Sequence, residues 1–348
     1  MLEKLIGNTH VKKILRRMLT LNRVPHSLIF AGAEGVGKKL FALELAKALV
    51  CQNPKDSEAC DVCGACRRAG KFVFPTSDKN DDYEKVIFSE HPDIGMVVPF
   101  KNSILVDAVR NLEREANFRP FEARARFLLI DNAEKLSAAK DNAANALLKT
   151  LEEPPPTSYI FLITSRPDAL LPTILSRCQM LRFSPVAPDE IENYLLRAKK
   201  FSPDDAALLA KLSKGSIGQA LETDSEKFRQ TREAMLKILE SLLISEDRSI
   251  LLRAAEEMND AKNKDNYKDT LEILETLIHD LWTLQLGNAK QIVNADIENQ
   301  LQKFAERADA KRLAAWLAEI ETMRQNFSVN LNRKIATDAL FMQMASRF

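Results

Sequence analysis

Proline is confined to the first part of this chain, and this distribution limits what the remainder can form. All fourteen prolines lie at or before Pro203, and only three glycines interrupt residues 204–348. Helix interiors exclude both residue types. The stretches 225–244 and 269–286 also carry apolar residues three and four positions apart, which is typical of amphipathic helices. We therefore expect the C-terminal region to be a helical bundle.

The first half of the chain instead alternates short apolar runs with helical patterns. The runs occupy residues 27–30, 94–98, 127–130, 159–164 and 179–183. Strands that are apolar throughout and are separated by helices are typical of a parallel sheet covered on both faces. The sequence therefore predicts an α/β fold of the nucleotide-binding type for this half.

A length of 348 residues corresponds to two or three domains. Prolines at 185 and 188 follow the last apolar run and mark an expected boundary. We predict three domains: an α/β domain over 1–186 with an insert at 51–66, a small helical domain over 187–224, and a helical C-terminal domain over 225–348.

Positive and negative charges nearly cancel, with 50 Lys and Arg against 49 Asp and Glu. This balance excludes the pervasive basic field of a charge-driven nucleic-acid binder, so any DNA contact must be local. The first ten residues include Glu3 and Lys4 and lack the apolar core of an export signal, and no long apolar run occurs elsewhere. We expect a soluble, cytoplasmic protein that does not bind membranes.

A phosphate-binding loop follows the first expected strand. The sequence GAEGVGKK places Gly32, Gly35 and Gly37 directly before Lys38 and matches the P-loop pattern. Its backbone N–H groups would surround phosphate, and Lys38 would reach the β- and γ-phosphates. Lys39 stands where the pattern requires the Ser or Thr that holds Mg²⁺, so metal binding should be weakened. The structural alternative is a glycine-rich turn without a ligand.

A second element of a phosphate site is FLLID, in which Asp131 follows a buried strand. The carboxyl ends of parallel strands are where ligands bind in open α/β sheets. Hydrolysing proteins of this layout place a Glu next to polarise the attacking water, but here Asn132 follows, and an amide is not a general base. Glu134 is an unfavourable replacement because it lies two residues further on. Alternatively, Asp131 only caps its strand.

Four of the five cysteines lie within sixteen residues, at Cys51, Cys60, Cys63 and Cys66. Pairs of thiolates two residues apart suit tetrahedral Zn²⁺, and four protein ligands leave no open position, so the metal would be structural. Two disulfides, or thiols grouped by coincidence, are the alternatives. Cys178 stands apart and is expected to be a small buried hydrophobic residue.

The tripeptide Ser176-Arg177-Cys178 precedes the last expected strand. Arg177 is either an ordinary surface residue or a group that reaches the γ-phosphate of a nucleotide on a neighbouring subunit. The residues alone leave both interpretations open. His26, beside the first strand, is expected to be structural.

Taken together, these motifs resemble the clamp-loader family of AAA+ proteins. Residues 145–164 (NALLKTLEEPPPTSYIFLIT) and 170–183 (LLPTILSRCQMLRF) are similar to the family's sensor-1 region and its Ser-Arg-Cys motif. The P-loop, the four-cysteine insert, HPDI at 91–94 and LLIDNAEKL at 128–136 occur in the family's order. The resemblance covers residues 1–220 and becomes looser in the tail. It implies a helical lid after the α/β domain and a collar through which subunits form a ring.

Three departures favour the delta-prime branch of this family, in bacterial DNA polymerase III, over its gamma/tau motor. They are Lys39, Asn132, and Gly218 at the position where motor subunits carry a sensor-2 arginine. Each removes a different part of phosphoryl-transfer catalysis, so the isolated chain is not expected to hydrolyse ATP. By resemblance, Arg177 would act in trans as an arginine finger on ATP held by the adjacent motor subunit.

The resemblance also implies partners and cofactors. The partners would be the gamma/tau motor and delta subunits, the sliding clamp and primer-template DNA, and the cofactor a structural Zn²⁺, with ATP or ADP binding left open. Two other functions compete with this interpretation: an active ATPase motor of the same family, and a zinc-dependent nucleic-acid-binding module supported by Arg67 and Arg68. Residues 72–90 lengthen the family's pattern and are expected to form a surface loop or short hairpin, with no assigned function.

Overall fold

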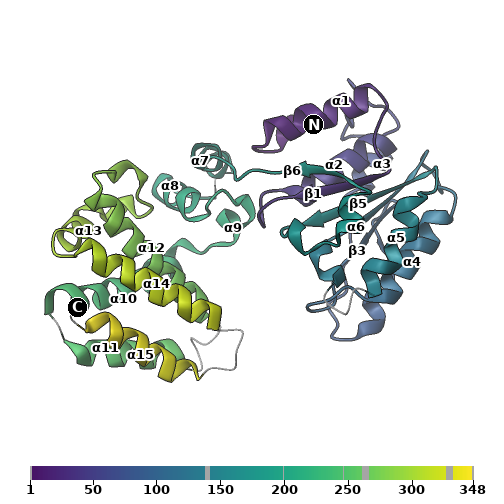
Figure 1. The fold of residues 1–348 in the computed structure, drawn as a ribbon. Helices are drawn as coiled ribbons and strands as arrows, with labels where there is room; N and C mark the ends of the chain where they lie inside the picture. The colour runs from purple at the N-terminus through teal and green to yellow at the C-terminus, as the bar shows by residue number, and fades with distance from the viewer. Residues whose placement is uncertain are drawn as a thin grey trace. The chain divides into compact units, whose positions relative to one another are not determined.

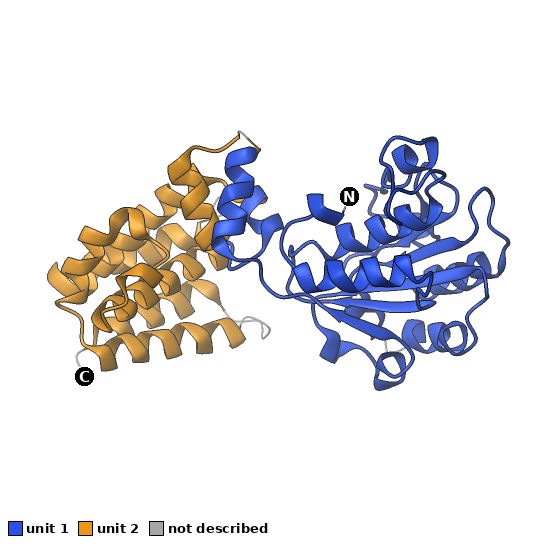
Figure 2. Cartoon of the chain, turned by 90° about the horizontal axis from the view of Figure 1, so that it is seen from above, with its two compact units in different colours: residues 1–197, 213–221 blue, residues 198–212, 222–348 orange. Residues whose placement is uncertain are grey.

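The structure is a computed structural model that describes residues 2–137, 142–198, 200–245, 247–260, 266–326 and 332–346. The chain divides into two compact units (Figure 2). The first comprises residues 1–197 and 213–221, and the second comprises residues 198–212 and 222–348. The predicted division into three domains stays a prediction. Residues 187–224, expected to form one small domain, are divided: 187–197 and 213–221 belong to the first unit, and 198–212 and 222–224 belong to the second.

A single sheet forms the centre of the first unit (Figure 1). Within the described residues it has six strands, in the order β2-β3-β4-β5-β1-β6. All neighbours are parallel except β2, which runs antiparallel to β3. The strands are β1 (Ser27–Ala31), β2 (Ile87–Phe88), β3 (Ile94–Val97), β4 (Arg126–Ile130), β5 (Ser158–Thr164) and β6 (Gln179–Arg182). The five apolar runs therefore correspond to the five parallel strands, and the predicted fold class is confirmed.

Helices cover both faces of this sheet, which explains why its central strands are apolar throughout. Along β1, Leu28 and Phe30 pack in one core together with α1 (Thr9–Thr20) and α2 (Lys38–Val50). Ile29 and Ala31 pack in a second core together with α4 (Val106–Asn117) and α5 (Asn142–Glu152). Successive side chains of a strand point to opposite faces, so each face receives alternate apolar residues.

His26 lies just before β1 and, as predicted, has a structural setting. Its Nδ1 lies 2.8 Å from the carbonyl oxygen of Ser158, and its ring stacks on Tyr159.

Short helices complete this unit. The short helices are 3-10 turns at Leu2–Lys4, Asn80–Tyr83, Ala133–Ser137 and Pro167–Ala169, together with α3 (Gly64–Arg68), α6 (Pro172–Leu175), α7 (Pro188–Arg197) and α9 (Ile217–Glu222).

The second unit is helical, as the scarcity of proline and glycine predicts. Its core surrounds Trp316, which is fully buried together with Leu274 and Phe341. The helices are α8 (Pro203–Leu212), α10 (Ser225–Glu240), α11 (Arg248–Asn259), α12 (Tyr267–Gln285), α13 (Glu298–Ala305), α14 (Ala310–Asn326) and α15 (Arg333–Ala345), with a π-helical turn at Ser241–Ser245 and 3-10 turns at Ala289–Gln291 and Ala295–Ile297. In the described part of the chain, no helix has the length and apolar character needed to cross a bilayer.

A buried polar network fixes the connection between α12 and α13. Arg232 on α10 donates to Asn294 and Asp296 at 3.0 and 2.8 Å. Asp280 on α12 accepts from the backbone amides of Val293 and Asn294. Because buried charges are stable only when they are paired and hydrogen-bonded, this network holds the loop in one conformation.

Candidate nucleotide site and cysteine cluster

The P-loop lies between β1 and α2 and depends on its glycines. Gly35 and Gly37 have φ values of +71° and +98°, in the left-handed region that side chains rarely adopt. A Cβ on Gly32 would lie 2.6 Å from the carbonyl oxygen of Phe183. The loop ends at Gly37, which caps α2 without a side-chain oxygen. The first amides of α2 therefore have no side-chain acceptor at this cap, as a phosphate site requires.

Lys38 lies inside the loop that it was predicted to serve. Its side chain is buried, and its Nζ donates to the carbonyl oxygens of Gly32 and Ala33 at 2.7 and 2.6 Å. Burial lowers the pKa of Lys38, although Glu134 and the other nearby carboxylates act in the opposite direction. An ammonium carries three N–H groups, so one remains to meet a phosphate oxygen.

Lys39 forms an ion pair with Asp131, the residue that follows β4. Asp131 is buried, whereas Lys39 keeps 42% of its side chain exposed. Mg²⁺ takes oxygen ligands in octahedral geometry. Position 39 offers an ammonium instead of a hydroxyl. That ammonium already forms an ion pair with the Asp131 carboxylate, which would otherwise orient the metal. The residues at this site therefore do not fit Mg²⁺.

The carboxylate nearest to Asp131 along the chain is also engaged. Glu134 is buried and accepts hydrogen bonds from the hydroxyls of Thr164 and Ser165 at 2.7 and 2.8 Å. Burial would raise the pKa of Glu134, but these hydrogen bonds outweigh it and lower the pKa below its usual value. Asn132, in the position of the water-activating Glu, offers only an amide. Glu134 is therefore held at the end of β5 as an ionised acceptor.

The start of α9 packs directly on the P-loop. The amide of Gly218 donates to the carbonyl oxygen of Gly35 at 2.9 Å, and a Cβ on Gly218 would lie 3.1 Å from the Gly35 Cα. A Cβ on Gly35 would meet the Ser216 hydroxyl at 2.1 Å. The sequence identified Gly218 only as a missing arginine, whereas the structure adds that two backbones approach closely at this position.

Restoring the arginine is therefore expected to destabilise this unit. Gly218→Arg should cost about 1–3 kcal/mol, as added atoms in a packed site usually do, and ATP turnover should stay at background. Thermal unfolding measures the first effect. Gly70→Arg is a matched control, because Gly70 is exposed and a Cβ there meets nothing within 4 Å. Equal melting temperatures of the two variants would contradict the packing argument.

Arg177 lies just after α6 and is exposed. Its Nη2 donates to Oε1 of Glu152, the last residue of α5, at 2.5 Å, and its Nη1 donates to the carbonyl oxygen of Thr173 at 2.8 Å. The guanidinium thus stands at the surface with a defined orientation. Cys178, predicted to be a small buried hydrophobic residue, is half-buried and packs against the core of α4 and α5, and burial raises the pKa of its thiol to about 12.

The four clustered cysteines converge as their spacing predicts. Their Sγ atoms all lie within 4.8 Å of one another, close to the separation of about 3.8 Å that tetrahedral Zn–S bonds of about 2.3 Å require. All five cysteines are free thiols, so the disulfide alternative does not describe this structure. Burial would raise the pKa of Cys63, but the amides of Cys66 and Gln52 lower it to about 6. The cluster can hold a metal ion.

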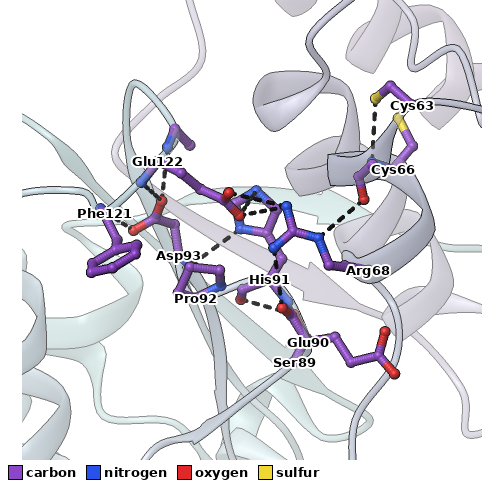
Figure 3. Close-up of polar contacts among 12 residues, drawn as sticks. Cys63, Cys66, Arg68, Ser89, Glu90, His91, Pro92, Asp93, Phe121 and Glu122 are labelled. Atoms are coloured by element: carbon purple, nitrogen blue, oxygen red, sulfur yellow. Dashed lines mark hydrogen bonds and ion pairs between the residues drawn. The ribbon is translucent and has the colours of Figure 1, made fainter.

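A polar network connects the cysteine cluster to the sheet (Figure 3). Arg68 on α3 pairs with Glu122 at 2.8 Å, and Glu122 lies 3.3 Å from Nε2 of the buried His91. Asp93, fully buried, accepts from the backbone amides of residues 121–123. The HPDI motif therefore braces the insert, a role that the sequence did not reveal. Arg67 and Arg68 were the two residues that supported a nucleic-acid-binding module. Arg68 instead pairs with Glu122 in this network.

Comparison with known proteins gives consistent matches along the chain. The family model described as DNA polymerase III, delta subunit, matches residues 7–187, and a second model, for the C-terminal part of the delta subunit, matches residues 226–344. A DNA polymerase III subunit delta' from Bacillus subtilis is 28% identical over 323 residues, 92% of this chain and 91% of the relative. Its counterpart from Pseudomonas aeruginosa is 31% identical over 331 residues, 92% of each chain. A tau subunit from Escherichia coli is 32% identical over 223 residues, 62% of this chain and 31% of the relative.

Proposed function

This chain belongs to the delta' family of DNA polymerase III subunits, and from that premise we propose that it is a clamp-loader subunit that does not hydrolyse ATP and instead assists a neighbour. The observation that carries this proposal is the ion pair between Lys39 and Asp131. It places a fixed ammonium on the carboxylate that a hydrolysing site uses to orient its metal.

The degenerate site keeps its shape and lacks its reactive groups. The glycine loop and Lys38 remain in place to surround phosphate. Water activation is lost, because Asn132 is no base and Glu134 is held by Thr164 and Ser165. Charge neutralisation by a sensor-2 arginine is lost as well, because position 218 is a glycine whose backbone packs against Gly35. Metal binding, water activation and charge neutralisation are therefore all missing.

Arg177 is the group that this chain lends to its neighbour. Support comes from its exposure and from the ordered turn after α6 that presents it. A guanidinium offers five N–H donors in a planar fork that suits phosphate oxygens. In the ring, Arg177 would neutralise charge on the γ-phosphate of ATP bound by the gamma/tau motor, while the helical second unit forms the collar. The delta subunit, the sliding clamp and primer-template DNA complete the set of proposed partners.

The cysteine cluster is proposed to hold a structural Zn²⁺. Cys51, Cys60, Cys63 and Cys66 supply four thiolates, which closes the coordination sphere and leaves no position for a reactive water. The metal would fold residues 51–66 and would take no part in phosphoryl transfer.

ATP turnover by the isolated chain tests the non-hydrolysing assignment. With Mg²⁺ present, the wild-type chain is expected to give the same steady-state rate as Lys38→Ala, because both lack a functional site. Addition of the purified motor subunit should then produce ATP turnover, because the motor subunit supplies the hydrolysing site. A wild-type rate clearly above the Lys38→Ala control, in material freed of contaminating ATPases, would favour an active motor subunit instead.

A further inference from the structure

The segment that follows the cysteine cluster contacts the ammonium of Lys39 through one aromatic ring. Phe72 packs against the core, and the ring of Phe74 stacks on it at a centroid distance of 5.4 Å and an angle of 8°. The Lys39 Nζ lies 6.0 Å from the centroid of Phe74. This aromatic pair begins the 72–90 insertion, for which the sequence offered no function. The insertion therefore reaches the nucleotide site.

Lys39 is consequently held from two directions. The Asp131 carboxylate pairs with its Nζ, and the Phe74 ring presents a π face to it. One N–H group of the ammonium serves Asp131, which leaves two for water or a ligand. The exposed 42% of the Lys39 side chain gives a ligand access to these donors.

The position of this ammonium decides how charge is balanced at the P-loop. Lys39 is the second residue of α2, whose first amides would surround phosphate. A divalent cation beside Asp131 would meet a positive charge that is already paired there, so the two cations exclude each other. A polyphosphate would find two ammonium groups from adjacent residues, Lys38 inside the loop and Lys39 at its edge.

We propose that Lys39 is a tethered cation that replaces the divalent metal, so that this P-loop binds the phosphates of a nucleoside di- or triphosphate without Mg²⁺. Phe74 helps to keep the ammonium in place through its ring face. The inference rests on the proposed degenerate nucleotide site and specifies what that site binds.

The test is equilibrium binding of ADP and ATP to the full chain, by titration calorimetry, in excess MgCl₂ and in EDTA. Wild-type affinity is expected to change by less than about twofold between the two buffers, and Lys39→Arg, which keeps the charge, should behave alike. Lys39→Thr restores the metal ligand and should bind at least about tenfold more weakly in EDTA than in MgCl₂. Lys38→Ala should lose binding in both buffers, which identifies the P-loop as the site.

Several outcomes would overturn the tethered cation. Wild-type binding that is tenfold tighter with Mg²⁺, no binding in EDTA, or a Lys39→Thr variant without metal dependence would each do so. Phe74→Leu keeps the bulk and removes the π face, and it should weaken binding a few-fold in both buffers, while unchanged affinity would remove Phe74 from the proposal. Because this experiment measures affinity and not turnover, its failure leaves the non-hydrolysing assignment to the ATPase measurement.

Discussion

Replacing Arg177 by alanine is expected to slow ATP hydrolysis at the adjoining motor subunit by about 10³- to 10⁵-fold, the range that an arginine finger contributes elsewhere. The physical reason is that the guanidinium neutralises charge that develops on the transferred phosphoryl group. The loss should therefore appear in the rate of the chemical step, and ATP binding should change little. Other motor sites in the ring keep their own neighbours, so total turnover should fall by less than turnover at this one site.

Releasing Arg177 from its present partner costs little. The Arg177 and Glu152 side chains keep 31% and 50% of their surface exposed, and exposed ion pairs contribute about 0–1 kcal/mol. A phosphate can therefore replace Glu152 as the partner of the guanidinium without a large penalty. For the same reason, Arg177→Ala should lower the melting temperature of the chain by no more than about 4 °C.

Single-turnover hydrolysis in the reconstituted complex, together with size-exclusion chromatography, measures rate and assembly separately. Arg110→Ala is the control, because Arg110 is an exposed arginine of the same unit that pairs with Asp107 on its own helix. Arg177→Lys keeps the charge but loses the planar fork, so it should remain well below wild type. Normal assembly with a wild-type rate in Arg177→Ala would refute the trans role, and failed assembly would assign Arg177 to the interface instead.

Much of the fold follows from the sequence because its signals are local. Buried parallel strands need apolar residues on both faces, so the runs at 27–30 and 127–130 identified β1 and β4 directly. The strand β2 was not assigned, since it is two residues long and lies within the polar insertion. β2 pairs with the free edge of β3. No periodicity along the chain encodes this pairing, because it depends on the tertiary context of the edge.

The site was predictable in its chemistry and not in its contacts. Lys39 and Asn132 were visible as departures from a motif. That Lys39 reaches Asp131 depends on how close the start of α2 lies to the end of β4, and that Glu134 meets Thr164 depends on β4 and β5 being neighbours. Such distances arise from strand order, which a single sequence specifies only through tertiary packing.

Loss of the metal is expected to unfold the cysteine insert and to destabilise the first unit. Structural Zn²⁺ sites contribute about 10–16 kcal/mol of apparent binding free energy, so removing one of four ligands forfeits a large share of it. The damage should spread beyond the insert, because Cys66 and Ala69 pack in the same core as Phe41 and Leu45 of α2. Cys63→Ser should therefore lose the metal and melt well below wild type.

Metal content by mass spectrometry and thermal unfolding with and without a chelator measure this effect. Wild type should carry one zinc per chain, and chelation should lower its melting temperature to that of Cys63→Ser. Cys178→Ser is the matched control, since Cys178 is half-buried like Cys63 but lies outside the cluster, and it should keep both zinc and stability. A metal-free wild type that is as stable as the loaded protein would show that the four thiols hold the insert by packing alone.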